Sequence, residues 1–392
     1  MTSPASAARV VGVDIARFVA LAGMMATHIL PSYEDGTTDL ALAQSVAGGR
    51  ASALFAVLAG VSLALTTGRT TPVRGRDFAS AAAGVAVRAL LIAAIGLALG
   101  AFDSGIAVIL TYYGVLFLLG IPFLMLRVRW LLALAVLWLV AAPVLAHLVR
   151  PMLPPFGFDS PSFEALADPG RLLGELTFTG YYPAVPWLAY LLVGMAIGRT
   201  DLTRWRAPVI LAAAGGVLVT VAVVTSDTLL RRPGVKAELA VAFGSPDDLE
   251  QVLAHGLHGT TPTDSWWWLA VRTPHTATSF DLAQTIGSAL LVLAGCLVLG
   301  RLLPRLMAVL FGAGAMTLTL YTAHVLLRVE LWDGDTTATY LGHVTAALVV
   351  GAVFGLTQTR GPLEARVGGL STRARRSFRH RHSAGFTRDA GG

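Results

Sequence analysis

The chain has 392 residues, of which 55% are hydrophobic and only 13% charged. Soluble domains normally carry about 25% charged residues, so this composition excludes a soluble cytosolic enzyme and a disordered protein. The formal net charge is +6, and arginine supplies nearly all of the base because Lys236 is the single lysine. One cysteine, Cys296, allows neither an internal disulfide nor a cysteine metal cluster. We therefore expect no metal site.

Ten apolar blocks follow one another along the chain, and most are long enough to cross a bilayer as helices. The blocks are continuously apolar rather than alternating, which argues against an outer-membrane β-barrel. Several are short or rich in glycine, so nine or eleven spans remain alternatives. The ten blocks are 10–30, 51–67, 80–101, 106–126, 130–148, 182–198, 208–225, 282–300, 306–328 and 340–356.

The segments between the blocks alternate in charge. Acidic residues dominate one set, including Glu34, Asp35, Asp103 and Asp159, and arginine dominates the other. Because arginine-rich loops remain in the cytoplasm, this pattern predicts cytoplasmic N- and C-termini. The arginines assigned to the inner side outside the C-terminal tail are Arg9, Arg69, Arg74, Arg76, Arg127, Arg129, Arg199, Arg204, Arg206, Arg301 and Arg305.

The sequence therefore predicts an all-α integral membrane protein of about ten transmembrane helices, placed in a bacterial cytoplasmic membrane. Residues 1–357 form one polytopic domain with long outer loops at about 149–180 and 226–281. Residues 358–392 are expected to be a disordered, basic cytoplasmic tail that rests on anionic lipid. The expected partners are membrane lipids rather than nucleic acid, and homo-oligomerisation is left open.

The first apolar block carries three ionisable residues, which are costly in a bilayer and therefore candidates for function. Asp14 and Arg17 are three residues apart, where a carboxylate and a guanidinium can pair on a helix. His28 follows Arg17 by eleven residues, on the same face and about 16 Å along the axis. Arginine can bind phosphate in a bidentate manner, and histidine can act as a general base. The alternative is a purely structural Asp14–Arg17 pair and a buried histidine satisfied by its neighbours.

At this point the chain resembles a known family. The spacing R-x10-H is similar to that in the first helix of membrane-integral acyltransferases. The segment 13–21, VDIARFVAL, resembles the opening motif of the heparan-α-glucosaminide N-acetyltransferase-like branch and of DUF418-type bacterial proteins, except that Phe18 replaces the usual glycine. Three later blocks also resemble that superfamily: GRASALFAVLAG at 49–60, YYPAVPWLAY at 181–190 and LYTAH at 320–324.

The resemblance implies acyl transfer across a membrane, from cytoplasmic acetyl-CoA or another short acyl-CoA to an extracytoplasmic hydroxyl or amine. Such an acceptor would be an envelope glycan, a lipid or a secreted metabolite. In this interpretation His28 is the base or the acyl carrier, and Asp14 and Arg17 orient the donor. The sugar specificity of the named family is not carried over.

Further residues complete the expected site. Arg88, within the third block, and Arg76 are the other candidates for binding the phosphates of CoA. The candidates for the acceptor side are Arg50, at the outer end of the second block, His275 and His324; the two histidines are also alternatives to His28 as the base. A secondary transporter or flippase with intramembrane Arg and His is the competing function, and a non-catalytic membrane scaffold is a third.

Overall fold

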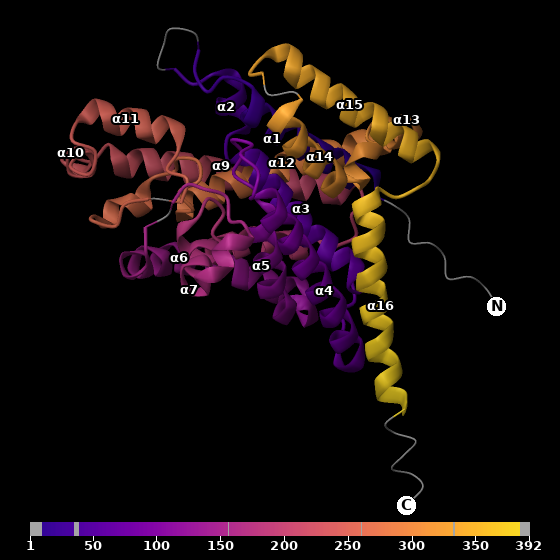
Figure 1. The fold of residues 1–392 in the computed structure, drawn as a ribbon. Helices are drawn as coiled ribbons and strands as arrows, with labels where there is room; N and C mark the ends of the chain where they lie inside the picture. The colour runs from indigo at the N-terminus through magenta and orange to yellow at the C-terminus, as the bar shows by residue number, and fades with distance from the viewer. Residues whose placement is uncertain (1–9, 35–38, 156, 260, 332–333, 385–392) are drawn as a thin grey trace, which may run out of the picture.

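The computed structural model describes residues 10–34, 39–155, 157–259, 261–331 and 334–384. Helices account for most of these residues, and none of them forms a β-strand (Figure 1). Within the described ranges, seven helical segments are long and apolar enough to cross a membrane, or eight if one bent pair is a single span. The seven are α1 (Val11–Ile29), α2 (Leu42–Ala47) together with α3 (Arg50–Thr66), α4 (Gly75–Leu99), α6 (Val128–Val149), α9 (Arg206–Leu230), α12 (Ser279–Leu302) and α15 (Thr337–Leu356).

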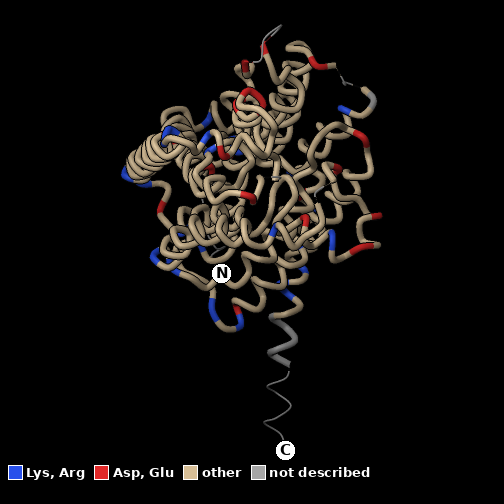
Figure 2. The backbone as a smooth tube through the Cα atoms, turned by 90° about the vertical axis from the view of Figure 1, so that its left-hand side faces the viewer, with Lys and Arg blue, Asp and Glu red and all other residues tan. Residues whose placement is uncertain are grey.

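The bent pair joins α7 (Pro169–Gly174) and a π-helical turn (Glu175–Thr179) to α8 (Ala184–Gly198), at an angle of 52°. In Figure 2 long stretches of the backbone carry no charge, and the charged residues gather at the ends and edges of the helices. The prediction of an all-α integral membrane protein is confirmed.

Two of the ten expected blocks do not form full-length helices. Block 106–126 gives α5 (Leu110–Gly120) followed by a 3-10 turn, Ile121–Met125. Block 306–328 is broken into α13 (Pro304–Leu310), a 3-10 turn at Gly312–Ala315 and α14 (Thr317–Glu330). The count of ten spans therefore stays a prediction.

Close backbone contacts explain the break before α14. A Cβ atom on Gly314 would lie 1.8 Å from the carbonyl oxygen of Asp14 in α1. A Cβ on Gly312 would lie 2.3 Å from the carbonyl oxygen of Gly351 in α15. Only glycine allows backbones to approach so closely. The broken segment is therefore wedged between α1 and α15.

Helix α1 is fixed on its other side by α12. A Cβ on Gly12 would lie 2.6 Å from Cα of Leu297, and a Cβ on Gly300 would lie 2.8 Å from the backbone nitrogen of Gly12. Helices α3 and α8 cross in the same manner, since a Cβ on Gly194 would lie 1.9 Å from the carbonyl oxygen of Val57. Small residues at such crossings are the usual means of packing membrane helices. They hold the ionisable face of α1 in the centre of the fold.

The C-terminal segment differs from its prediction. Instead of a disordered tail, Pro362–Ala384 form α16, which lies along α4 (Figure 1). The hydroxyl of Ser80 donates to the carbonyl of Arg375 at 2.9 Å, and that of Ser371 donates to the carbonyl of Gly84 at 2.8 Å. These contacts order a highly charged segment that composition alone assigns to disorder. Residues 385–392 lie outside the described residues.

The expected loop 226–281 is partly helical as well. Helix α9 continues to Leu230, and α10 (Val235–Ala240), α11 (Pro246–His255) and a 3-10 turn at Trp266–Ala270 follow it. These short elements enclose a small separate core around Leu239, Leu249 and Trp268. The region therefore forms a compact cap at one end of α9 and α12 (Figure 1).

Candidate active site

The ionisable pair on α1 has the geometry that its spacing predicts. Arg17 donates from Nη1 to Oδ1 of Asp14 at 3.0 Å and from Nη2 to the hydroxyl of Ser62 in α3 at 2.5 Å. The Asp14 side chain is only 8% exposed, whereas that of Arg17 is 24% exposed. A guanidinium has five N–H donors, and these bonds use two. Asp14 and Ser62 therefore orient Arg17 while leaving part of its fork accessible to an anion.

Arg17 lines a large cavity, with a volume of about 1040 Å³. Small-molecule sites typically measure roughly 300–1,000 Å³. Five arginines line the cavity, together with two acids and an aromatic wall. These residues are Arg17, Arg69, Arg88, Arg360, Arg375, Asp14, Glu364, Phe55, Tyr113, Phe117 and Tyr321. The excess of positive charge is typical of a site for a polyanion.

Two of these arginines have buried N–H groups without an acceptor among the described residues. The guanidinium of Arg88 lies over the ring of Phe117 at 5.5 Å, and its buried Nε has no hydrogen-bond partner among the described residues. Arg375 of α16 donates from Nη1 to the carbonyl of Thr66 at 3.1 Å, but its buried Nε also has no partner within the described part of the chain. Buried polar groups are nearly always paired, so both nitrogens are candidate donors to an anionic ligand.

Only some of the residues predicted to bind the donor line the cavity. Arg17 and Arg88 line it together, whereas Arg76 is exposed at the start of α4 and is not among its lining residues. Arg360 and Arg375 were not predicted, because they belong to the segment assigned to the tail. Glu364 of α16 accepts hydrogen bonds from the backbone nitrogens of Leu318 and Thr319. It thereby caps the start of α14 and attaches α16 to the cavity rim.

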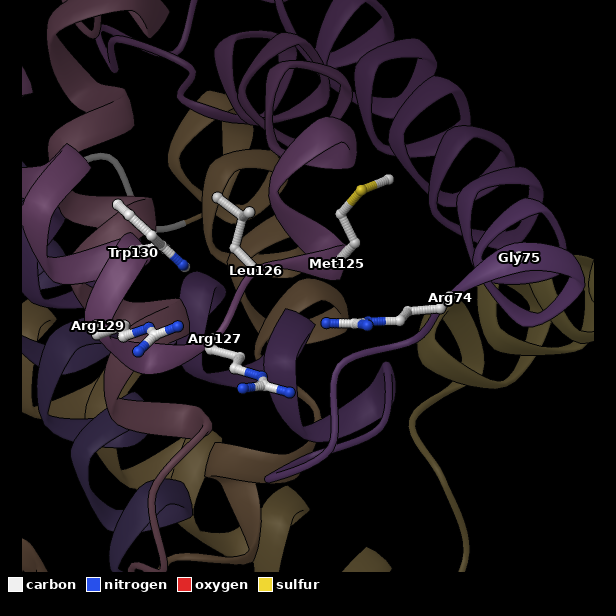
Figure 3. A pocket seen from close by; sticks show the side chains of 7 residues that line it. All are labelled: Arg74, Gly75, Met125, Leu126, Arg127, Arg129 and Trp130. Carbon is white, nitrogen blue, oxygen red and sulfur yellow. The ribbon is translucent and has the colours of Figure 1, made fainter.

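A second, smaller pocket of about 390 Å³ lies near the start of α4 and α6. Arg74, Arg127 and Arg129 surround it, with Trp130 and Met125 as apolar walls (Figure 3). All five side chains are exposed, so solvent and lipid headgroups can satisfy these arginines. This pocket fits the topological role that the charge pattern predicts, and its arginines are suitable controls for those of the large cavity.

The predicted base lies in a row of histidines. Nδ1 of His28 is 3.2 Å from Nε2 of His324 in α14, and Nδ1 of His324 is 3.1 Å from Nδ1 of His343 in α15. His324 and His343 are buried, whereas His28 is half-buried. Among the described residues, no group of three or more His, Cys, Asp or Glu side chains could hold a metal ion. The two nitrogen–nitrogen distances show that hydrogen bonds link the three rings. His343 was not predicted from the sequence.

The remaining predicted residues gather near His28. His275 stacks on His258 with ring centroids 5.2 Å apart and contacts the ring of Tyr182 edge-on at 5.7 Å. The pKa of His275 is lowered to about 3, first by burial and then by the neighbouring His258 and His28. A Cβ on Gly49 would lie 3.2 Å from Pro274, which places the start of α3 against the same loop.

Arg50 begins α3 at this end of the fold. It donates from Nη1 to the carbonyl of Ser45 at 2.5 Å, and the buried carboxylate of Asp281 in α12 faces it. Arg50, His275, His324 and His28 are thus brought together at one end of α1. Arg17 and Arg88 line the cavity at the other.

Comparison with known proteins identifies the family. The family model described as heparan-alpha-glucosaminide N-acetyltransferase, catalytic, matches residues 9–230. The chain belongs to this family. It is therefore an acyltransferase of the membrane, which favours enzymatic acyl transfer over the transporter and scaffold alternatives. No curated protein matches the chain. Asp14, Arg17, His28 and Arg88 lie inside the matched segment, whereas His324 and Arg375 lie beyond it.

Proposed function

We propose that this enzyme transfers an acetyl or other short acyl group from acyl-CoA to a hydroxyl or amine acceptor, with the donor bound in the arginine-lined cavity. The observation that carries the proposal is the cavity itself. It presents Arg17, Arg88 and Arg375 to one volume, and two of these have buried N–H groups without a partner in the described residues.

The chemistry of the donor fits this arrangement. CoA carries a diphosphate and a 3′-phosphate, and guanidinium groups bind phosphate through paired, charge-assisted hydrogen bonds. The aromatic wall formed by Phe55, Tyr113 and Phe117 can take the apolar parts of the donor. Asp14 contributes by holding Arg17, so we assign it an orienting role. Among the predicted donor residues, Arg76 has the least support because it is exposed away from the cavity.

We assign the role of general base to His28. Its ring accepts the proton of the acceptor as the acceptor oxygen or nitrogen attacks the thioester carbon. The new bond joins the acceptor to the acyl carbon, the carbon–sulfur bond breaks, and the proton passes from His28 to the departing sulfur. His275 lies near His28, and Arg50 follows Gly49, which packs against the loop of His275. We assign both residues to the acceptor.

We further propose that the two substrates enter from opposite sides of the membrane. The cavity is lined in part by Arg69, Arg360 and Arg375, in segments that the charge pattern assigns to the cytoplasm. His28 lies toward the opposite end of α1. This arrangement suits a bacterial cytoplasmic membrane, with CoA on the inside and an envelope glycan, lipid or secreted metabolite outside.

The donor site is tested by CoA binding to the purified full-length protein in detergent. CoA is expected to raise the thermal unfolding temperature, because a ligand that binds only the folded state stabilises it. Arg88→Gln should weaken CoA binding about 10- to 100-fold, the equivalent of one or two charge-assisted hydrogen bonds. Arg127→Gln, in the smaller pocket, is the matched control and should bind CoA normally.

The base is tested separately. Acetyl-CoA hydrolysis without added acceptor, or acetyl exchange onto labelled CoA, should be lost in His28→Ala while CoA binding persists. Absence of CoA stabilisation in the wild-type protein would refute the donor site. Normal turnover in His28→Ala would refute the base.

A further inference from the structure

We infer that His324 and His343 are positioning residues that act through His28: they fix the proton on Nδ1 of His28 and so present its Nε2 as the base. The inference rests on the proposed function of His28 and extends it to residues beyond the family match. It is carried by the two ring-to-ring distances, 3.2 Å between His28 and His324 and 3.1 Å between His324 and His343.

Each of these distances is that of a hydrogen bond. A neutral imidazole has one N–H donor and one bare nitrogen that accepts. His324 uses both of its nitrogens in the row, so it must donate at one and accept at the other. The tautomer of His324 therefore couples His28 to His343, and only two proton arrangements satisfy both hydrogen bonds.

In the first arrangement, His28 donates from Nδ1 to Nε2 of His324, and His324 donates from Nδ1 to Nδ1 of His343. Nε2 of His28 then carries a lone pair and can accept a proton. In the second arrangement every donor and acceptor is reversed, and Nε2 of His28 carries a proton instead. Only the first arrangement makes His28 a base at Nε2.

The surroundings favour a row of neutral rings before reaction. His324 is 1% exposed and His343 is 3% exposed, and burial disfavours an isolated charge. Among the described residues, Arg328 of α14 is a charged group that faces both His28 and His324, and it opposes a further positive charge there. Arg328 is held by the carboxylate of Asp335 and the carbonyl of Gly334. On the other side His28 faces His275.

The row then serves the transfer step as follows. The acceptor's proton moves to Nε2 of His28 as the acceptor bonds to the acyl carbon. The resulting imidazolium donates from Nδ1 to His324, and His324 in turn donates to His343, so the positive charge is stabilised by two hydrogen bonds in series. As the carbon–sulfur bond breaks, the same proton leaves Nε2 for sulfur and the row returns to its first arrangement. This function parallels that of the carboxylate that orients the histidine in a catalytic triad.

The test measures kcat, KM for acetyl-CoA and CoA affinity in His324→Phe, His324→Gln and His343→Phe. His324→Phe removes the acceptor for Nδ1 of His28 and is expected to lower kcat about 10²- to 10⁴-fold. KM and CoA affinity should not change, because the donor cavity is lined by other residues. His324→Gln keeps an amide oxygen that can accept this hydrogen bond. Its kcat should be at least tenfold higher than that of His324→Phe. His343→Phe should lower kcat less, since His28 keeps its direct partner.

The control is His255→Phe, since His255 lies in α11 and bonds the carbonyl of Gln251. Retained CoA stabilisation shows that each variant is folded. The inference is overturned if His28→Ala is inactive while His324→Phe keeps wild-type kcat. It is also overturned if His324→Gln is no more active than His324→Phe, which would indicate that His324 only fills space. Full activity in His28→Ala would instead refute the proposed base on which the inference rests.

Discussion

Arg199 is a buried residue that links three segments by hydrogen bonds, and its replacement tests how these segments support the donor cavity. It directly follows α8 and is 2% exposed. Nη1 donates to the carbonyls of Thr67 and Arg69, both at 2.8 Å, and Nη2 donates to the carbonyl of Leu124 at 2.6 Å. One guanidinium thus joins the end of α3, the turn before α4 and the 3-10 turn before α6.

Arg199→Lys keeps the charge but concentrates it on one nitrogen, which cannot reach both sets of carbonyls. At least one buried carbonyl loses its charged donor. A hydrogen bond to a charged group contributes about 1.5–3 kcal/mol, so losing one or two should lower the free energy of unfolding by roughly 2–5 kcal/mol. The side chain of Arg69 lines the donor cavity. Because Arg199 also holds the backbone of Arg69, the same variant should weaken CoA binding.

Thermal unfolding in a fixed detergent measures the effect, with Arg204→Lys as the control. Arg204 pairs with Asp201 at 3.1 Å, but its side chain is 77% exposed, and exposed ion pairs contribute only about 0–1 kcal/mol. Arg199→Lys should lower the unfolding temperature by roughly 2–6 °C for a chain of this length, and Arg204→Lys should scarcely change it. Equal unfolding temperatures in the two variants would refute the stabilising role of the Arg199 hydrogen bonds.

Two further changes probe opposite ends of α1. Gly314→Ala places a Cβ 1.8 Å from the carbonyl oxygen of Asp14, so α1 must shift and CoA affinity should fall. The control is Gly216→Ala, whose Cβ meets open space and which should bind CoA normally. Equal CoA affinities in the two variants would contradict the close packing of Gly314 against α1. His275 has a pKa of about 3 because it is buried, so it stays neutral in the folded protein while the unfolded chain takes up a proton below pH 6.5. The contribution of neutral His275 to the free energy of unfolding is therefore fully present above pH 6.5. Below pH 6.5 this free energy decreases by about 1.4 kcal/mol for each unit by which the pH falls. Unfolding temperatures from pH 7.5 to 4.5 should therefore fall more steeply in the wild type than in His275→Gln, and parallel curves would contradict this account.

The parts of the site that depend on local spacing could be predicted from the sequence. The ion pair between Asp14 and Arg17 follows from their separation by three residues. Arg76 and Arg88 show the limit of this reasoning, since both lie on α4 and both suit a phosphate. Twelve residues of helix rotate the side chain by about 120° from the starting direction, so only one faces the cavity. Which one does so depends on how α4 packs against α5 and α16.

The long-range contacts carry no local signal. His28 and His324 are separated by 296 positions, and only the crossing of α1 with α14 brings them together. Helix α16 presents the same difficulty, because its charge favours disorder when it is considered alone. Its order comes from Ser80 and Ser371 at the contact with α4 and from Glu364 at the start of α14. A segment predicted to lie apart from the domain thereby supplies two arginines to the cavity.

Helix α1 connects the two halves of the proposed reaction. Arg17 and His28 are eleven residues apart, about 16 Å along a helix, and the contacts of Gly12 and Gly314 prevent that helix from sliding. In acyl-CoA the thioester is at the end of a long pantetheine arm, far from the phosphates. In the proposed reaction, a donor whose phosphates bind Arg17 extends its thioester toward His28, which is not itself among the residues that line the cavity. The binding energy gained at the arginines is then used to position the reacting carbon, which is how remote contacts contribute to catalysis.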